Sequence, residues 1–153
     1  MKKEGVILIA EDDEGHFSLI KKSLQRAGVC NEILRLADGQ ETIDFLFIKG
    51  DGPKRQPDKE YLLLLDIRMP KIDGVQVLEK IKQNEELKKI PVIMLTVADD
   101  PHTIERCHNL GCSVYIVKPA EYEDFQDAVK KVGLFLSFVE VPRIKRTEQE
   151  KVK

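Results

Sequence analysis

Short apolar runs alternate with amphipathic segments along most of this chain. The runs are rich in Val, Ile and Leu, as in strands that are buried on both faces of a parallel sheet. They lie at residues 5–10, 32–36, 61–65, 91–95 and 114–117. Between them, apolar residues recur at helical spacing, as Phe17, Ile20 and Leu24 do in the first intervening segment. This alternation predicts five strand–helix units in a single domain.

Gly, Pro and acidic residues indicate where the helices begin and end. Gly28 and Gly111 follow the first and fourth amphipathic segments, where a glycine C-cap is expected. Asp100 and Pro101 form an acidic N-cap and a proline at the first helical position of the fourth. The other helices are indicated by apolar stripes, listed here: Ile43, Leu46 and Phe47; Val77, Leu78 and Ile81; and Tyr122, Phe125, Ala128, Val129 and Val132.

Five strand–helix units predict an α/β fold of the flavodoxin-like (βα)5 type, a doubly wound open sheet. We expect five parallel strands in the order 2-1-3-4-5, which places the first and third strands side by side. We assign residues 1–142 to this domain, including an extended C-terminal helix and tail. Residues 143–153 are charged and are expected to be disordered. No DNA-binding or enzymatic output domain is expected after the sheet.

Composition excludes several classes of protein. The chain has 153 residues with 42% hydrophobic residues, enough for one core, and its net charge of -2 argues against nucleic-acid or membrane-surface binding. It has neither a transmembrane run nor a signal-peptide pattern. Cys30, Cys107 and Cys112 are odd in number and lack metal-ligand spacing, so we expect reduced thiols in a cytoplasmic protein.

Polar residues whose side chains can bind a metal ion or take part in a reaction follow the expected strands. Glu11 and Asp12 come after the first strand and Asp66 after the third. Because parallel strands end at one edge of the sheet, these carboxylates should meet there and bind Mg²⁺. A carboxylate beside that ion can attack phosphorus. Thr96 and Lys118, at the ends of the fourth and fifth strands, would supply a hydroxyl and an ammonium to phosphoryl oxygens.

The neighbours of these residues receive simpler interpretations. Arg68 cannot bind a cation through its side chain, but we expect its backbone carbonyl to reach the ion. Asp13 is expected to cap the first helix. His16, His102 and His108 have no carboxylate or histidine partner at ligand spacing, so we expect them to be structural or solvated.

Together these residues resemble the response-regulator receiver family over about residues 5–132. The resemblance rests on an ordered set of motifs, namely Glu11-Asp12, Asp66, Met69-Pro70, Asp73-Gly74, Thr96, Tyr115 and Lys118-Pro119. It implies that Asp66 accepts a phosphoryl group from the phosphohistidine of a sensor histidine kinase. It also implies Mg²⁺ on Asp12, Asp66 and the Arg68 carbonyl, with Glu11 acting mostly through water.

The same resemblance implies how the domain signals. Thr96 and Tyr115 would form a switch that alters the face made by the fourth helix, fifth strand and fifth helix. Catalysis would be limited to self-phosphorylation and slow autodephosphorylation, so the protein is not expected to be an enzyme. A cis peptide bond is expected between Lys118 and Pro119. Where the family usually has a small residue after the threonine, Val97 stands here, and we expect its branched side chain to crowd the phosphoryl entrance.

Three segments resemble the single-domain regulators that are paired with bacterial phytochromes. They are the insert at 50–60, Glu105-Arg106-Cys107, and the apolar tail at 135–142. This resemblance implies a bacteriophytochrome as the kinase. The apolar residues after Val132 are too numerous for one core-facing stripe. Two alternatives follow: the tail packs on its own domain, with Gly133 kinking the helix, or the fifth strand, fifth helix and tail form a homodimer.

Other phosphate-handling classes fit the sequence less well. A phosphatase of the haloacid dehalogenase type needs a second Asp two residues after the nucleophile, where this chain has Arg68. The same residue argues against the Asp-x-Asp pair of a topoisomerase-primase metal domain. A flavodoxin-like nucleotide-binding module needs an anion loop after the first strand, where the acidic run at 11–13 would repel phosphate.

Overall fold

Five parallel strands form a central sheet in the order β2-β1-β3-β4-β5, as the sequence predicts. The computed structural model describes residues 1–147. The strands are β1 (Val6–Ala10), β2 (Glu32–Leu36), β3 (Lys59–Leu65), β4 (Val92–Thr96) and β5 (Val114–Val117). A short sixth strand, β6 (Arg143–Ile144), pairs antiparallel with β3 and was not predicted.

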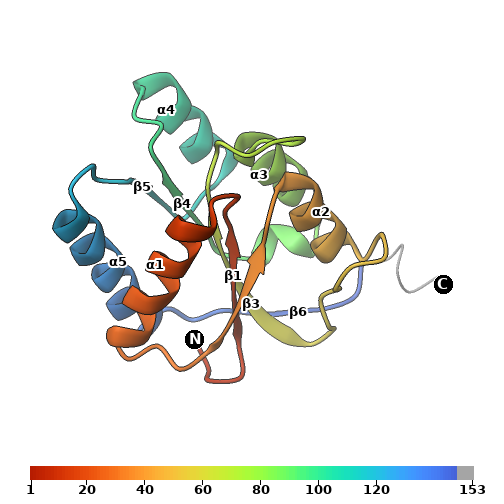
Figure 1. Ribbon diagram of the computed structural model, residues 1–153. Helices are drawn as coiled ribbons and strands as arrows, with labels where there is room; N and C mark the ends of the chain where they lie inside the picture. The colour runs from red at the N-terminus through yellow and green to blue at the C-terminus, as the bar shows by residue number, and fades with distance from the viewer. Residues whose placement is uncertain (148–153) are drawn as a thin grey trace.

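Helices cover both faces of the sheet (Figure 1). On one face lie α1 (Glu14–Arg26) and α5 (Tyr122–Leu136), which pack against each other. On the other lie α2 (Gly39–Phe47), α3 (Gly74–Lys82) and α4 (Pro101–Leu110), with a single 3₁₀ turn at Leu87–Lys89 between α3 and β4. The flavodoxin-like fold is therefore confirmed.

The apolar run of β3 is continuous because both of its faces are buried. Leu62 and Leu64 point into a core shared with α1 and α5, whereas Leu63 and Leu65 point into a core shared with α2, α3 and α4. All four side chains are buried. Alternate residues of a strand face opposite sides, so each layer of helices receives half of the run.

The predicted N-caps of α1 and α4 are present. The Asp13 carboxylate accepts a hydrogen bond from the backbone N–H of His16 at 3.0 Å. Asp100 accepts one from Thr103, also at 3.0 Å, and Pro101 occupies the first turn of α4. These contacts satisfy N–H groups that have no partner within the helix.

Gly133 is a point of close approach and does not interrupt α5. The helix continues through it to Leu136. A Cβ atom at this position would lie 2.8 Å from the Cβ of Ala27 at the end of α1. The glycine therefore permits close packing of α5 on α1, whereas the sequence had suggested a kink.

The chain after α5 forms a strap, defined here as residues 137–147, that crosses the lower edge of the sheet (Figure 1). Within it, Arg143 and Ile144 pair with Glu60 and Lys59 of β3. Ile144 has an exposed fraction of 0% and belongs to the core under α2 and α3. The prediction of a disordered tail from residue 143 is thus wrong for 143–147, because one buried isoleucine anchors the segment. Residues 148–153 lie outside the described part of the chain.

The polar insert before β3 helps to hold the strap. Arg55 is buried, and its guanidinium donates hydrogen bonds to the carbonyls of Leu46 at 2.7 Å and Lys145 at 3.3 Å. The backbone N–H of Lys145 donates to a carboxylate oxygen of Glu86 at 2.7 Å. Both backbone polar groups of Lys145 are therefore paired with residues outside the strap.

The expected cis bond between Lys118 and Pro119 is wrong, because every peptide bond in residues 1–147 is trans. Lys118 continues the β5 ladder through its N–H, which donates to the carbonyl of Thr96 at 2.7 Å. Its long side chain then turns toward the end of β3, so the trans form, which X-Pro bonds generally prefer, is sufficient.

Within residues 1–147, no helix combines the length and the hydropathy needed to cross a membrane.

Removing side-chain volume at Ile144 tests whether the strap belongs to the core. Ile144→Ala should lower the free energy of unfolding by about 2–5 kcal/mol, because it leaves a cavity at a fully buried site. Urea unfolding measures the change. Arg146→Ala, at an exposed position of the same strap, is the control and should stay within about 0.5 kcal/mol of wild type. Equal stability of both variants would mean that the strap is dispensable.

Candidate active site at the carboxyl edge of the sheet

Three carboxylates converge where β1 and β3 end. Ala10 and Leu65 are register partners, so the residues that follow them, Glu11 and Asp66, emerge side by side. The backbone N–H of Asp66 donates to the carbonyl of Ala10 at 3.1 Å, which extends the ladder to this point. One carboxylate oxygen from each of Glu11, Asp12 and Asp66 lies within 4.8 Å of the others. The sequence prediction of a carboxylate cluster is correct.

Lys118 from the end of β5 bridges two of these carboxylates. Its Nζ donates to Asp66 Oδ2 at 3.0 Å and to Glu11 Oε1. The Lys118 side chain is only 3% exposed, so the contact is shielded from water. A buried ammonium between two buried carboxylates is stabilised by short-range charge pairing that solvent cannot screen.

Burial has the largest effect on the protonation of Glu11. It raises the pKa of the Glu11 carboxyl from 4.5 to about 7, and repulsion from Asp66 acts in the same direction. The hydrogen bond and charge of Lys118 oppose this shift. A divalent cation would add positive charge beside Glu11 and so favour its ionised form.

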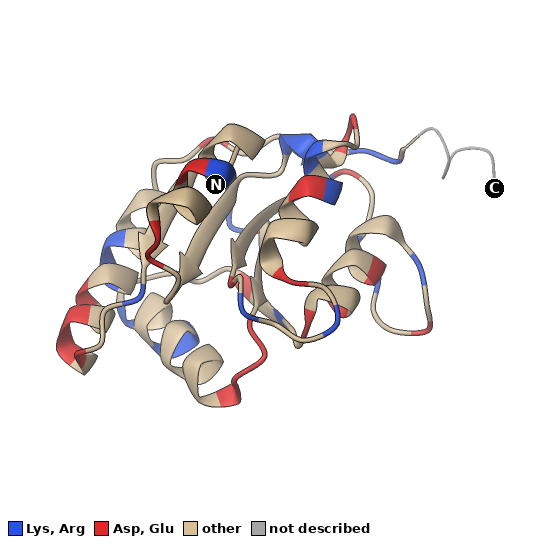
Figure 2. Cartoon of the chain, turned by 90° about the horizontal axis from the view of Figure 1, so that it is seen from above, with Lys and Arg blue, Asp and Glu red and all other residues tan. Residues whose placement is uncertain are grey.

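The donor set fits a hard divalent cation. Asp12 is exposed, whereas Glu11 and Asp66 are buried, so the cluster opens to solvent on one side. Carboxylate oxygens beside open solvent suit Mg²⁺, which retains several water ligands. The Arg68 carbonyl accepts no hydrogen bond within residues 1–147, and the Arg68 N–H donates to Asp66 Oδ1 at 3.3 Å. In Figure 2, acidic loop segments lie just beyond the strand arrowheads.

The turn after β3 is packed tightly against the site. A Cβ atom on Gly74 would lie 2.2 Å from the carbonyl oxygen of Asp66, so only glycine fits there. Asp73 beside it caps α3 through Gln76 in a reciprocal capping box. Met69 is buried in the core. The residues from Met69 to Gly74 therefore fix the backbone that carries Asp66.

Thr96 and Tyr115 are connected through Ala98. The Ala98 N–H donates to Thr96 Oγ1 at 3.4 Å, and the Tyr115 hydroxyl donates to the Ala98 carbonyl at 2.6 Å. Thr96 is buried, Tyr115 is half-buried, and its ring lies 6.4 Å from that of His108 on α4. Val97 is exposed between Thr96 and Ala98. One short loop thus joins the site to the surface of α4 and β5.

Two residues near the site were not identified from the sequence. His16 was expected to lack a carboxylate partner, but its Nδ1 lies 3.6 Å from Glu11 Oε1 and 3.4 Å from Lys118 Nζ. Its position in the first turn of a helix that starts at this edge could have indicated the contact. Arg35 on β2 contacts the turn after β1. Its contacts depend on the strand register, which the sequence does not reveal.

Residues 7–130 match the family profile of the response regulator receiver domain. The chain belongs to the response regulator receiver family. Of the residues that carry the resemblance, Glu11, Asp66, Thr96 and Lys118 lie at or just after the ends of β1, β3, β4 and β5. The protein is thus a receiver domain of the two-component signalling type and belongs to a family of signalling proteins, not of classical enzymes.

Relatives include regulators linked to phytochromes. The response regulator Rcp1 of Synechocystis is 32% identical over 130 residues, which cover 85% of this chain and 87% of Rcp1. A receiver domain structure from Rhodospirillum rubrum has a TM-score of 0.85 and 39% identity, covering 92% of this chain and 99% of that one. The phosphorylated cyanobacterial phytochrome response regulator RcpA has a TM-score of 0.82 and 32% identity, covering 91% and 99%.

The raised pKa of Glu11 predicts a pH dependence of the metal-free protein. Folded Glu11 keeps a proton that the unfolded chain releases near pH 4.5, so its contribution to stability is lost as pH rises through about 7. In EDTA, the free energy of unfolding should therefore fall more for wild type than for Glu11→Gln between about pH 5 and about pH 8. Urea unfolding at these two values tests this, and parallel changes in both proteins would contradict it.

Proposed function

We propose that this protein is a single-domain response regulator that accepts a phosphoryl group on Asp66 from a sensor histidine kinase. The observation that carries the proposal is the bridge from Lys118 Nζ to Asp66 and Glu11, beside Asp12. It combines a nucleophilic carboxylate, a fixed ammonium and a cation-binding edge in one place. Phosphoryl transfer depends mainly on such positioning and charge compensation.

In the transfer step, an Asp66 oxygen attacks phosphorus and the bond between phosphorus and the kinase histidine nitrogen breaks. Lys118 then pairs with a phosphoryl oxygen, and this contact replaces its ion pair with Glu11. The Thr96 hydroxyl donates to a second phosphoryl oxygen. Hydrolysis of the acyl phosphate returns Asp66 to its starting form, so self-phosphorylation and slow autodephosphorylation are the only reactions we assign.

We assign the metal site to Glu11, Asp12, Asp66 and the backbone carbonyl of Arg68. A bound Mg²⁺ supplies positive charge to the transferring phosphoryl oxygens. The three clustered carboxylates support this assignment. So does the Mn²⁺-bound structure of Rcp1, which is 31% identical, has a TM-score of 0.82 and covers 90% of this chain and 99% of Rcp1.

The output face would be α4, β5 and α5. When Thr96 turns toward the phosphoryl group, the Ala98 peptide that it holds moves with it, and Ala98 also anchors the Tyr115 hydroxyl. The charge added at Asp66 would thereby bias the position of Tyr115 between α4 and β5. Val97, which follows Thr96, is exposed. Its branched side chain would crowd the phosphoryl entrance and slow access to Asp66.

The partner is a sensor histidine kinase, and the likeness to RcpA and Rcp1 favours a bacteriophytochrome. Because such a kinase takes its phosphoryl group from ATP, we assign the regulator to the cytoplasm. We assign it no nucleic-acid or membrane partner. The net charge of -2 supports this, since both surfaces attract cationic proteins.

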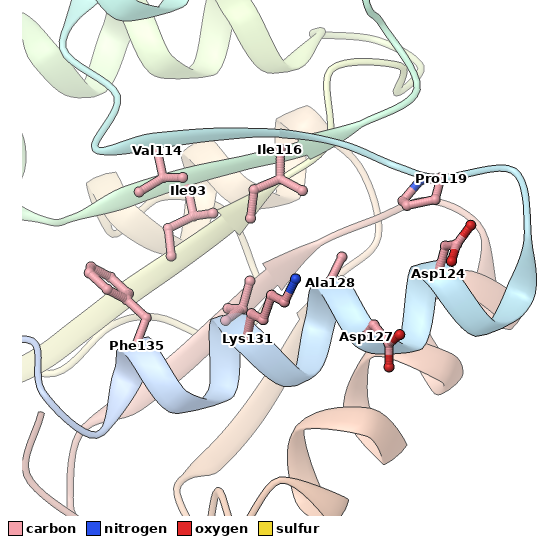
Figure 3. Close-up of a pocket in the computed structure, with 10 residues that line it drawn as sticks. Ile93, Val114, Ile116, Pro119, Asp124, Asp127, Ala128, Lys131 and Phe135 are labelled. Carbon is pink, nitrogen blue, oxygen red and sulfur yellow. The ribbon is translucent and has the colours of Figure 1, made fainter.

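We further propose that a second copy of the chain covers the groove between β5 and α5. This groove has a volume of about 540 Å³ and is lined mainly by apolar side chains (Figure 3). Among residues 1–147, β5 is the last strand of the sheet and has no neighbouring strand on its outer side. Phe138, just beyond α5, is 82% exposed, and Phe135 and Leu134 are also exposed. An apolar groove and several exposed apolar side chains on the same helix and tail are typical of an interface.

Charges along the groove favour a twofold arrangement with antiparallel α5 helices. Asp124 and Asp127 line the N-terminal half of the groove, and Lys131 lines the C-terminal half (Figure 3). In an antiparallel pair, the acidic half of each helix would face the basic half of the other. Because the face includes β5 and α5, dimerisation would be coupled to phosphorylation. The alternative, packing of the tail on its own domain, accounts for Leu136 and Ile144 but not for Phe138.

Asp66→Asn should abolish phosphorylation, because the amide is a poor nucleophile and binds Mg²⁺ less well. Intact-mass spectrometry after incubation with acetyl phosphate and Mg²⁺ measures the gain of one phosphoryl group. Asp99→Asn, at an exposed acidic position on the same edge, is the matched control and should label like wild type. Labelling of the Asp66→Asn variant at another residue would refute the assignment of the phosphoacceptor.

Charge exchange tests the dimer and its orientation. Lys131→Asp should weaken association in sedimentation, because two acidic groups would then face each other, and Asp127→Lys should weaken it too. The variant with both changes should recover much of the wild-type association. A Phe135→Asp, Phe138→Asp variant should remain monomeric. A wild-type protein that is monomeric at every concentration, with and without a phosphoryl mimic, would show that the groove is not a dimer interface.

A further inference from the structure

Arg35 holds the backbone of the acidic turn that follows β1. Its Nε donates to the carbonyl of Glu11 at 3.1 Å, and its Nη2 donates to the carbonyl of Asp12 at 2.8 Å. These two nitrogens lie on the same side of a planar guanidinium, which matches two neighbouring acceptors. One side chain from β2 therefore fixes two successive peptide groups of the turn that carries the acidic pair.

Asp12 depends on its backbone more than the other two carboxylates do. The side chains of Glu11 and Asp66 are each tied to Lys118. The Asp12 carboxylate is exposed and makes no hydrogen bond or ion pair with any residue in 1–147. Its direction toward the cluster is thus set by the peptide groups on either side, and Arg35 holds both of their carbonyls.

Other contacts of Arg35 do not explain its position. It lies beside the first turn of α1, where the helix dipole disfavours a cation. Its ion pair with Glu14 spans 3.4 Å, and the Glu14 side chain is 88% exposed, so that pair contributes little. Its guanidinium carbon lies 5.8 Å from the centre of the Phe17 ring, a contact that orients the guanidinium plane. The hydrogen bonds to the carbonyls of Glu11 and Asp12 are therefore the contacts that explain the position of Arg35.

We propose that Arg35 is a positioning residue for the divalent cation, an inference that rests on the metal site of the proposed function. By fixing the carbonyls of Glu11 and Asp12, it keeps the Asp12 carboxylate aimed at the cluster before the ion arrives. Without this contact the turn must be ordered during binding, and that ordering weakens affinity. Groups that orient metal ligands have effects of this kind although they never touch the metal.

The charge of Arg35 would act in the opposite direction, because a guanidinium repels Mg²⁺. Two substitutions separate charge from geometry. Arg35→Lys keeps the positive charge but cannot hold two carbonyls with a planar fork. Arg35→Met removes both the charge and the hydrogen bonds while retaining an unbranched apolar side chain over Phe17. Positioning predicts weaker Mg²⁺ binding in both variants, whereas charge alone predicts tighter binding in the methionine variant and no change in the lysine variant.

Calorimetric titration of the metal-free protein with Mg²⁺ measures the dissociation constant directly. Both Arg35 variants should bind Mg²⁺ about 10-fold more weakly than wild type. Glu14→Gln, which removes the ion pair but not the carbonyl contacts, should bind like wild type. With acetyl phosphate, the Arg35 variants should need more Mg²⁺ for half-maximal labelling and reach the wild-type rate at saturation. Melting curves in EDTA establish that each variant is folded.

Wild-type affinity in both Arg35 variants would overturn the proposal, as would tighter binding by Arg35→Met. A lower melting temperature with unchanged Mg²⁺ affinity would also overturn it, since Arg35 would then be purely structural. If wild type binds Mg²⁺ but is not labelled by acetyl phosphate, phosphoryl transfer is refuted. The Mg²⁺ affinities of wild type and the Arg35 variants then still test the role of Arg35. Absence of Mg²⁺ binding by wild type would overturn the metal site and the role of Arg35 together.

Discussion

The ammonium of Lys118 sits between carboxylates that would otherwise repel each other inside the protein. Glu11 and Asp66 are buried at the ends of neighbouring strands, and Lys118 Nζ contacts both. Leaving either carboxylate unpaired at such depth would cost several kcal/mol, on the order estimated for uncompensated buried charges. The pairing therefore constrains how β1, β3 and β5 end relative to one another, and the loops around the site adapt to it.

That constraint also bears on the phosphorylation that we propose for Asp66. A single ammonium contacts two of the three clustered carboxylates, and burial, helped by repulsion from Asp66, raises the pKa of Glu11. The proposed cation and phosphoryl group would add charged partners for Lys118 and for the carboxylates that it contacts. Thr96 and Tyr115 share Ala98 as a common contact, so a change at the buried edge has a short route to α4 and β5.

The other end of the sheet is organised by apolar burial and not by charge. Ile144 enters the core below β3, and the insert before β3 supplies Arg55 to hold the strap. This arrangement leaves the strap's first residues near α5, where Phe138 is exposed. The protein thus uses part of its apolar tail for its own core and leaves part on the surface beside the groove.

The sequence alone determined the order of strands and helices, because each strand is a short apolar run and each helix has an apolar stripe. It also predicted that Glu11, Asp12, Asp66 and Lys118 lie together, since parallel strands deliver their following residues to one edge. Only the tertiary structure revealed the roles of residues whose contacts lie far away in sequence. Arg35 on β2 and His16 on α1 both contact Glu11, and Ile144 of the strap pairs with Lys59 of β3. The trans bond before Pro119, where a cis bond was expected, was likewise seen only in the tertiary structure. Such contacts depend on register and distance between elements, which local sequence patterns do not encode.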